Sequence, residues 1–393
     1  MSREARAQGR AICVVGGGIA GTACALRLAA AGHRVRLLAG SAPLPADDAD
    51  EIRYYALSPA SIAMLERLGI DVGGLGACPY TDMRVWGGAL RDGLHFSMAE
   101  APLGAAALGR IVGHGALLRA LRTRADSALT VMAVDARTTE TLPERVDIDC
   151  SDGDLVTADL VVAADGAHSA LREAAGIPVN AWQYEQRGIV ANIACDAGLQ
   201  ATAWQRFLPD GVLALLPLDA ERASIVWSAD DATADHLMGL DDGAFGEVLA
   251  AALQQHLGGV RVLSRRADFP LGAAHAERYW APRLALLGDA AHVIHPLAGQ
   301  GLNLGLADAG ELAAALSRHP GELARALRGY SRRRRTATAD MIMITDGLHR
   351  LFGPAGPDFA ELREAGMAMV NRLTPLRRML VERALDTRDA QVS

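Results

Sequence analysis

The first forty residues alternate between apolar runs and glycines. Residues 11–15 are all apolar and are followed by glycines, which predicts a short buried strand. Residues 19–31 form an alanine-rich stretch that predicts a helix ending at Gly32, and residues 34–38 predict a second strand. Strand, glycine turn, helix and strand in this order predict a βαβ unit.

Apolar runs of helical and strand length continue along the chain. Ser58 followed by Pro59 is a favourable helix start, as a cap and a first-turn proline. Helices are predicted at residues 59–68, 115–124, 244–257 and 301–316, and from there to residue 393 with breaks at 353–357 and at Pro375. Further buried strands are predicted at residues 160–164 and 283–287.

Between residues 184 and 229 the pattern changes to short apolar runs separated by Pro, Gly and Asp. Such runs predict a mostly antiparallel sheet in a second domain. The predicted strands are residues 187–195, 204–208, 212–216 and 223–228.

Composition excludes several classes of function. The 393 residues include 39 basic and 46 acidic side chains, a net charge of −7, which argues against nucleic acid as the main partner. No lysine is present, which excludes a Schiff-base lysine, pyridoxal-phosphate chemistry and a P-loop. Five scattered cysteines without a CxxC pair predict free thiols in a reducing cytoplasm, not a zinc site or a disulfide framework.

The N-terminal arginines and the apolar stretch at residues 11–31 resemble a signal peptide or a short membrane span. The glycines within this stretch favour a different explanation, because Gly16, Gly18 and Gly21 form a G-x-G-x-x-G turn between a strand and a helix. Such a turn lets the backbone approach a pyrophosphate at the helix N-terminus. No other segment offers the ~20 uninterrupted apolar residues of a spanning helix.

A dinucleotide site of this kind normally has an acidic residue at the end of the second strand, where it binds the ribose hydroxyls. Here Ala39 and Gly40 occupy that strand end. The carboxylates that follow within residues 47–51 are interpreted as a solvated loop.

Two further segments combine turns and helix starts with polar side chains. In the first, Asp165 and Gly166 form a turn after a strand, Ser169 can cap a helix, and Arg172 can pair with Asp165 or face a phosphate. Taken alone, this segment is a turn followed by a capped helix.

The longest segment covers residues 287–305. A strand ends at Gly288, Asp289 can accept hydrogen bonds from sugar hydroxyls, and a glycine-rich loop then leads to the free N–H groups of a helix at residues 299–303. His292 and His295 lack the further ligands of a metal site, so no metal is predicted.

In their order, the three segments resemble the class A flavoprotein monooxygenases, and residues 289–305 resemble the signature of the ubiquinone-biosynthesis hydroxylases. Residues 53–58 (Arg-Tyr-Tyr-Ala-Leu-Ser) are similar to that family's arginine segment beside the flavin, and residues 345–352 to its C-terminal helix. The resemblance spans nearly the whole chain. It implies an α/β fold like that of para-hydroxybenzoate hydroxylase: a Rossmann-like FAD-binding domain, an inserted, mostly antiparallel β-sheet substrate domain, and C-terminal helices.

The domains expected from this resemblance are discontinuous. The FAD-binding domain comprises residues 1–75, 101–180 and 276–335, and the substrate domain residues 76–100 and 181–275. Residues 336–393 form the C-terminal helical segment.

The resemblance also implies FAD as cofactor and NAD(P)H as co-substrate. The three glycines would approach the pyrophosphate, Asp289 would hold the ribitol, and residues 299–303 would surround the pyrimidine end of the ring. The full implied set of cofactor-binding residues is Gly16, Gly18, Gly21, Arg53, Asp165, Gly166, Ser169, Arg172, Gly288, Asp289, Pro296, Gly299, Gln300, Gly301, Leu302 and Asn303. No side chain is required as a covalent nucleophile.

Two positions depart from the family. Ala39 stands where the family usually has Glu, and residues 111–114 (Ile-Val-Gly-His) stand where a Glu-Asn pair usually follows Ile-Val. The loss of a carboxylate at position 39 predicts that FAD is held less tightly.

The implied reaction is hydroxylation of an aromatic ring by NAD(P)H and dioxygen through a flavin hydroperoxide. The implied substrate is an apolar polyprenylated phenol of ubiquinone biosynthesis, with a ubiquinone-biosynthesis complex as a partner. The expected location is the cytoplasm, without an integral membrane span, and peripheral contact with the inner membrane is left open. Two alternatives also remain open: a hydroxylase of a small soluble aromatic or natural product, and a flavin-poor scaffold subunit.

Overall fold

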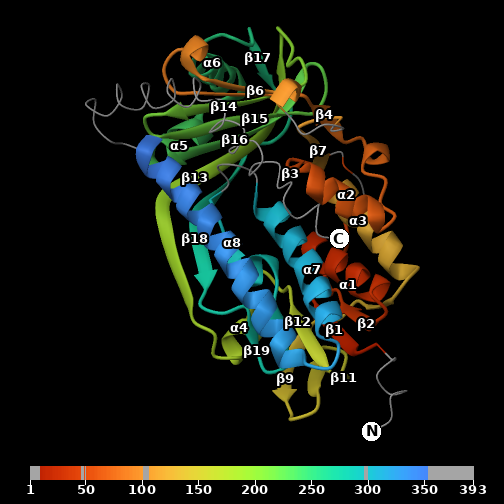
Figure 1. The fold of residues 1–393 in the computed structure, drawn as a ribbon. Helices are drawn as coiled ribbons and strands as arrows, with labels where there is room; N and C mark the ends of the chain where they lie inside the picture. The colour runs from red at the N-terminus through yellow and green to blue at the C-terminus, as the bar shows by residue number, and fades with distance from the viewer. Residues whose placement is uncertain (1–8, 46–47, 49, 101–105, 296–299, 353–393) are drawn as a thin grey trace.

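The computed structural model describes residues 9–45, 48, 50–100, 106–295 and 300–352 (Figure 1). A six-stranded sheet forms the lower part of the molecule in Figure 1. Its order is β19 (Trp280–Ala281), β20 (Leu284–Leu286), β12 (Leu160–Ala163), β1 (Ala11–Val15), β2 (Arg34–Leu38) and β8 (Thr130–Met132). All neighbouring strands are parallel except β19 and β20. The predicted βαβ unit is therefore confirmed, with α1 (Ile19–Ala30) as its helix.

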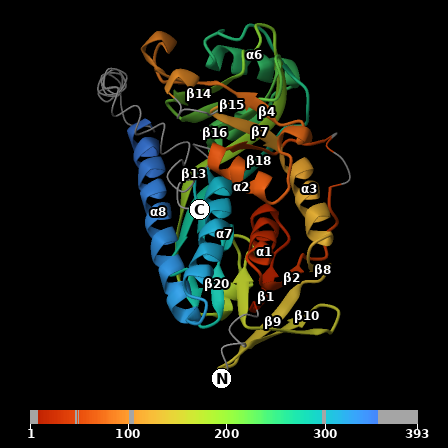
Figure 2. The same cartoon turned by 45° about the vertical axis from the view of Figure 1, so that its right-hand side comes forward.

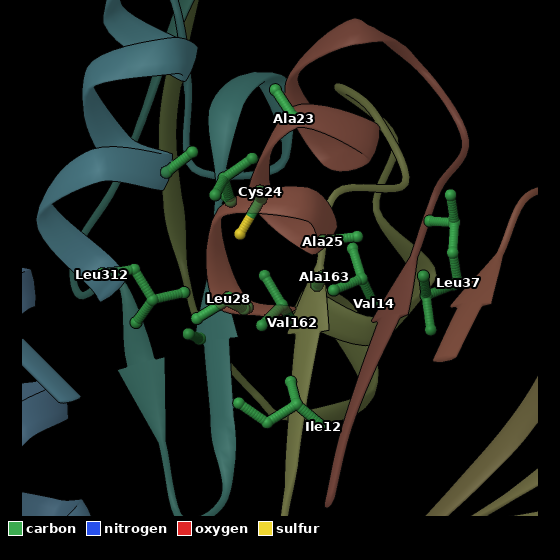
Figure 3. Packing of buried hydrophobic residues seen from close by; sticks show 14 of the residues in the cluster. Ile12, Val14, Ala23, Cys24, Ala25, Leu28, Leu37, Val162, Ala163 and Leu312 are labelled. Carbon is green, nitrogen blue, oxygen red and sulfur yellow. The ribbon is translucent and has the colours of Figure 1, made fainter. Parts of the chain in front are cut away.

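The core of this sheet is built around the small residues of α1. Figure 3 shows Cys24 and Leu28 lying between the strands and Leu312. Ala23, Cys24 and Ala25 are fully buried, so the alanine-rich stretch allows the helix to pack closely on its neighbours.

A nine-stranded sheet forms the upper part of Figure 1. Its strands are β21 (His292–Val293), β18 (Ala267–Ala276), β13 (Val179–Cys195), β16 (Arg222–Asp230), β15 (Gly211–Pro217), β14 (Thr202–Leu208), β5 (Asp82–Trp86) and β6 (Leu94–Ser97), with β17 (Val260–Val262) paired to β13. Only the β14–β5 pair is parallel. Helices α5 (Asp231–Gly239) and α6 (Asp242–Ala252) contribute Leu237, Phe245 and Leu249 to its core.

Two small sheets complete the strand inventory of the described residues. One joins β3 (Tyr54–Leu57), β7 (Gly109–Gly113) and β4 (Cys78–Tyr80), and the other joins β11 (Leu155–Ala158), β10 (Val146–Cys150) and β9 (Ala136–Thr141).

The remaining helices lie around these sheets. They are α2 (Pro59–Arg67), α3 (His114–Asp126), α4 (Ala170–Ala174), α7 (Gly301–Arg318) and α8 (Leu323–Phe352), with short 3-10 turns at Gly73–Leu75, Leu90–Asp92, Met98–Glu100 and η5 (Gly288–Ala290). Figure 2 shows α7 and α8 packed side by side. No helix in the described part of the chain is long and apolar enough to cross a membrane.

The expected α/β fold is confirmed, and two predicted elements need correction. The helix expected at residues 244–257 ends at Ala252, because Gln254 and Gln255 adopt a left-handed backbone. The strand expected at residues 187–195 begins eight residues earlier, at Val179, and bends at an irregularity between Gln183 and Arg187. The breaks predicted at residues 353–357 and at Pro375 lie outside the described residues.

The predicted domain division stays a prediction. The nine-stranded sheet draws most of its strands from residues 76–100 and 181–275, but β21 comes from the other predicted domain. Helix α8 runs across the predicted boundary at residues 335/336 without interruption.

Candidate cofactor-binding site

The three sequence segments meet at one edge of the six-stranded sheet. They follow β1, β12 and β20, which are adjacent and parallel in the order β20-β12-β1. Because parallel strands end at the same edge, their carboxyl-terminal turns lie side by side. Such an edge is where open α/β sheets bind ligands.

The glycine turn after β1 is shaped by close backbone contacts. A Cβ atom on Gly16, whose φ is +117°, would lie 2.0 Å from the carbonyl oxygen of Ala164, and one on Gly21 would lie 2.1 Å from that of Gly16. Both positions therefore require glycine. A Cβ atom on Gly18 would meet no atom within 4 Å, so the backbone at the start of α1 is open to a ligand. This is the arrangement expected for a pyrophosphate at a helix N-terminus.

The segment after β12 forms a turn and a capped helix. Ser169 accepts a hydrogen bond from the Arg172 N–H (3.0 Å), and one Asp165 carboxylate oxygen accepts one from the Leu171 N–H (3.3 Å). The other carboxylate oxygen of Asp165 is buried and has no hydrogen-bond partner in the described part of the chain. Gly166, at φ +89°, has no atom within 4 Å of a Cβ position. The turn thus presents both an open backbone and a polar atom that a ligand can satisfy.

Arg172 connects this segment to the third one. Its guanidinium donates a hydrogen bond to the carbonyl oxygen of Ala290 (2.9 Å), so the side chain holds two segments together. Gly288 (φ +59°), Ala20 and Gly305 pack against one another, which brings η5, α1 and α7 into contact. Asp289 lies between the buried residues Gly288 and Ala290 in the chain, and its side chain is exposed.

Residues at the N-terminus of α7 are placed by Asn303. Its side chain accepts a hydrogen bond from the Ser58 N–H (3.0 Å) and donates one to the carbonyl oxygen of Ala56 (2.9 Å). Asn303 also donates to Gln300 (3.2 Å), while Leu302 packs against the core. Its side chain therefore fixes α7 to β3 and to the start of α2. A Cβ atom on Gly301 would meet no described residue within 4 Å.

Pro296 and Gly299, which belong to the predicted set, lie outside the described residues. The two histidines of this segment have separate surroundings. His292 contacts Asp308, and the His295 ring lies against Tyr184 with 4.8 Å between ring centroids. Within the residues that the structure describes, no group of three or more His, Cys, Asp or Glu could hold a metal ion.

Arg53 lies next to Tyr55 of its own segment, and Tyr55 in turn contacts His114. Its guanidinium is 5.4 Å from the centroid of the Tyr55 ring, and the Tyr55 hydroxyl is 3.1 Å from His114 Nδ1. Burial raises the pKa of Tyr55 to about 12, and the negative charge of Asp289 adds to this effect. The arginine segment is therefore within electrostatic reach of the third segment. The contact between His114 and Tyr55 was not predicted because it depends on β3 pairing with β7, which places Tyr54 opposite Gly113.

The acidic loop before β3 is not wholly solvated, which corrects the sequence interpretation. Glu51 accepts hydrogen bonds from the N–H groups of Gly115 (2.6 Å) and Arg53 (2.7 Å). Asp48 forms an ion pair with Arg119 (2.6 Å). A carboxylate at the first turn of α3 is favoured by the helix dipole, so these side chains anchor the loop to that helix.

The end of β2 lacks a carboxylate, but one from another strand lies beside it. The Ser41 hydroxyl donates a hydrogen bond to Asp135 (2.7 Å), and a Cβ atom on Gly40 would lie 3.3 Å from the other Asp135 oxygen. Asp135 follows β8, which pairs with β2, and its side chain is exposed. Arg122 contributes a positive charge nearby through its contact with the Gly17 carbonyl oxygen (3.4 Å).

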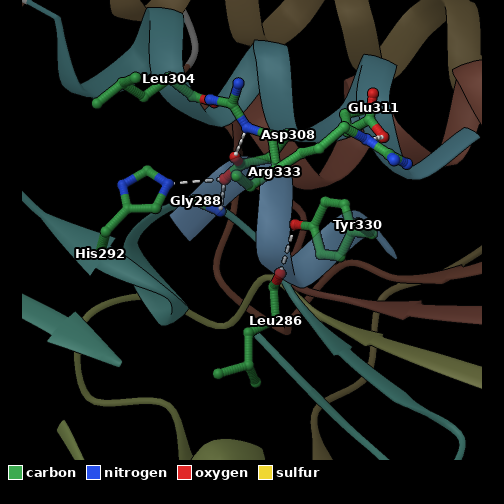
Figure 4. Close-up of polar contacts among 9 residues, drawn as sticks. Leu286, Gly288, His292, Leu304, Asp308, Glu311, Tyr330 and Arg333 are labelled. Carbon is green, nitrogen blue, oxygen red and sulfur yellow. Dashed lines mark hydrogen bonds and ion pairs between the residues drawn. The ribbon is translucent and has the colours of Figure 1, made fainter. Parts of the chain in front are cut away.

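A buried ionic network supports η5 from behind (Figure 4). The fully buried carboxylate of Asp308 contacts His292 Nε2 (2.7 Å) and Arg334 Nε (2.6 Å) and accepts a hydrogen bond from the Gly288 N–H (3.0 Å). Burial by itself raises the pKa of Asp308, but His292 and Arg334 outweigh burial and hold the pKa below its ordinary value of 3.8. The network ties α7 and α8 to the turn that carries Asp289.

The residues present at this edge fit a dinucleotide cofactor. Gly18 and Gly166 leave the backbone open, Asp165 has an unsatisfied oxygen, and Asp289 presents an exposed carboxylate. Open backbone suits phosphates and a ring edge, and carboxylates suit sugar hydroxyls.

Comparison with known proteins agrees with this fit. Residues 10–345 match the family described as FAD binding domain. The chain is 35% identical over 387 residues to the ubiquinone hydroxylase UbiL of Rhodospirillum rubrum, covering 96% of this chain and 89% of that protein. It is 33% identical over 386 residues to the 3-demethoxyubiquinol 3-hydroxylase of Escherichia coli, covering 95% and 98%.

A solved structure of a probable FAD-dependent monooxygenase is also similar to this chain. PqsL from Pseudomonas aeruginosa, a probable FAD-dependent monooxygenase, is similar with a TM-score of 0.76 and 25% identity, covering 92% of this chain and 99% of that one. The family match covers most of the sequence, and both relatives align along nearly all of it. The chain belongs to the FAD-binding monooxygenase family that includes the ubiquinone-biosynthesis hydroxylases.

Proposed function

We propose that this FAD-dependent monooxygenase hydroxylates the aromatic ring of a polyprenylated phenol in ubiquinone biosynthesis, with NAD(P)H and dioxygen as co-substrates. The observation that carries the proposal is the alignment, over 95% or more of this chain, with two relatives named for hydroxylation in the ubiquinone series. An apolar cluster at the junction of β4, β5, β6 and β7 also supports it, since a prenyl tail needs apolar surface. This cluster consists of Leu108 with the partly buried Tyr80, Met83, Phe96 and Met98.

Bound FAD supplies the redox chemistry, by accepting a hydride from NAD(P)H and activating dioxygen for transfer of one oxygen atom. We assign the turn at Gly18 and the N-terminus of α1 to the pyrophosphate, and Asp289 to the ribitol hydroxyls. The N-terminus of α7, at Gly301, is assigned to the pyrimidine end of the ring. Its helix dipole and free N–H groups stabilise negative charge there.

The site's further residues position these groups. Arg172 holds the segment after β12 against η5, and Asn303 holds α7 against β3. Arg53 adds a positive charge beside Tyr55 at the same edge. The protein's task is to orient the ring and exclude water while oxygen is transferred.

We further propose that the protein works at the cytoplasmic face of the inner membrane, in contact with other enzymes of the pathway. The reason is physical, because a polyprenylated phenol partitions into the bilayer and its hydroxylase has to meet it there.

The test is chemical complementation. A strain that lacks this gene is expected to accumulate a polyprenylated phenol lacking one ring oxygen, and the wild-type gene is expected to restore ubiquinone. An Asp289→Ala gene serves as the control that lacks the cofactor carboxylate. Normal ubiquinone in the deletion strain, with no second hydroxylase expressed, contradicts the proposed substrate.

Purified protein distinguishes the remaining alternatives. A hydroxylase of small soluble aromatics oxidises NAD(P)H with such a compound and leaves the prenylated phenol unchanged. A scaffold subunit is colourless and oxidises no NAD(P)H with either compound.

A further inference from the structure

A hollow of about 830 Å³ lies beside α8. Its lining comes from α8, the long blue helix of Figure 1, from residues 275–280 and from His319 at the end of α7. Six arginines border it: Arg278, Arg325, Arg328, Arg332, Arg333 and Arg335. Among the described residues that line it, none is acidic and none belongs to the three cofactor segments. In a chain with a net charge of −7, this is a marked local concentration of positive charge.

The run of four arginines in α8 is divided between two environments. Arg334 points inward to Asp308 (2.6 Å), and Arg333 forms an ion pair with Glu311 (2.5 Å). Arg332 and Arg335 border the hollow, as Arg333 does, but they have no carboxylate partner in the described residues. The run therefore does more than cover a solvated helix face, because Arg334 neutralises a buried acid while Arg332, Arg333 and Arg335 border the hollow.

Several hydrogen-bonding atoms around the hollow have no protein partner. Arg333 Nη2, Arg335 Nε and His275 Nε2 are buried and make no hydrogen bond with any described residue. A buried polar atom without a partner is costly, and a ligand with several acceptor oxygens satisfies such atoms.

The other three arginines of the hollow, Arg278, Arg325 and Arg328, have at most one long carboxylate contact among the described residues. The Arg328 guanidinium lies 5.7 Å from the centroid of the Trp280 ring, and Arg278 donates to the carbonyl oxygen of Gly176 (3.2 Å). Arg325 has only a long, exposed contact with Glu322 (3.4 Å). A bound anion relieves the mutual repulsion among these guanidinium groups.

We propose that this hollow binds a phosphate-bearing group, either on a free small molecule or on the headgroup of an anionic phospholipid. Phosphate carries up to two negative charges and several acceptor oxygens, and arginine binds it in a bidentate geometry. The volume of the hollow is within the range of small-molecule sites. The site is separate from the FAD site and does not depend on the proposed substrate.

The first experiment uses the FAD-loaded full-length protein, so that the glycine turns are already filled. Inorganic pyrophosphate is titrated by calorimetry, and Trp280 fluorescence is followed because Arg328 lies over its ring. The pocket variant is Arg328→Gln/Arg332→Gln. The matched control, Arg145→Gln/Arg261→Gln, removes the same charge from exposed positions elsewhere, one just before β10 and one in β17. We expect binding by the wild type and the control, at least about tenfold weaker binding by the pocket variant, and equal FAD content in all three.

The second experiment uses vesicles of phosphatidylcholine with or without phosphatidylglycerol in a sedimentation assay. Pyrophosphate binding that only the pocket variant loses supports a free phosphorylated ligand. Retention on phosphatidylglycerol vesicles that only the pocket variant loses supports a lipid headgroup. The proposal is overturned if the wild type binds neither probe, or if the pocket variant and the control lose binding equally.

Discussion

Asp289 is the exposed carboxylate at the centre of the three segments, and its side chain adds little to the core. Asp289→Ala is therefore expected to remain folded while binding FAD about 10- to 100-fold more weakly, since a hydrogen bond to a charged group contributes about 1.5–3 kcal/mol. Flavin absorbance of the purified protein and circular dichroism measure the two properties. Asp126→Ala, which removes an exposed carboxylate at the end of α3, is the control. Full flavin content in Asp289→Ala contradicts the assignment to the ribitol.

A substitution at Ala39 is expected to strengthen FAD binding, whereas Asp289→Ala weakens it. Ala39→Glu places a carboxylate at the end of β2, where it can bind ribose hydroxyls with Arg122 nearby, and it is expected to tighten FAD binding about tenfold. The measurement is a fluorescence titration of apoprotein with FAD.

Asp135 provides the matched comparison. If the carboxylate of Asp135, beside Ser41, already binds the adenosine, then Asp135→Asn weakens FAD and Ala39→Glu gives no gain. Equal binding by the wild type and both variants indicates that the adenosine lies elsewhere.

Among single residues, the sequence predicted those whose role depends only on their neighbours along the chain. Gly16 and Gly21 follow from the turn they form, and contact distances explain why no side chain fits there. The roles of Glu51 and Asp135 depend on partners at Gly115 and Ser41, 64 and 94 residues away in the chain. No local pattern contains that information.

The contact between α7 and α8 depends on the buried carboxylate of Asp308, whose removal is expected to destabilise the fold. Asp308→Asn leaves Arg334 and His292 without their charged partner, and it is expected to lower the free energy of unfolding by about 3–5 kcal/mol. Urea unfolding measures this loss. Glu311→Gln, one turn further along α7, removes the more exposed pair with Arg333 and is expected to cost less than about 1 kcal/mol. If Asp308→Asn and Glu311→Gln lose similar amounts of unfolding free energy, burial of the ion pair does not explain the effect.

The same carboxylate predicts a pH dependence. Because the pKa of Asp308 is lower in the folded protein than its ordinary value of 3.8, its stabilising contribution is complete above that value and is lost as the pH falls below it. Between pH 5 and pH 3 the wild type is expected to lose more unfolding free energy than Asp308→Asn. Parallel losses in the two proteins indicate that other carboxylates dominate acid unfolding.

Elements with a strong local signal were predicted well, as with β1, α1 and β2. The end of α6 was missed because the left-handed turn at Gln254 and Gln255 uses residues that rarely signal such a turn. The early start of β13 was missed because residues 179–186 are polar at many positions. They form a strand through pairing with β18, which lies some ninety residues further along the chain.

The whole molecule joins its two large sheets at the cofactor edge. Strand β20 belongs to the six-stranded sheet and β21 to the nine-stranded sheet, and only η5, with Asp289, lies between them. A cofactor bound at η5 therefore contacts one of the connections between the two sheets. If the sheets unfold as one cooperative unit, FAD stabilises both of them.

Tryptophan fluorescence reports on the sheet that lies away from most cofactor contacts. Four of the five tryptophans are on its strands: Trp86 on β5, Trp182 on β13, Trp204 on β14 and Trp227 on β16. Adding FAD to apoprotein at about one hundred times its Kd is expected to raise the free energy of unfolding detected by these residues by about 2.7 kcal/mol. Asp289→Ala at the same FAD concentration is expected to show a smaller increase, because its Kd is higher. A fluorescence transition that FAD leaves unchanged, while circular dichroism of the helices shifts, means that the nine-stranded sheet unfolds independently of the cofactor edge.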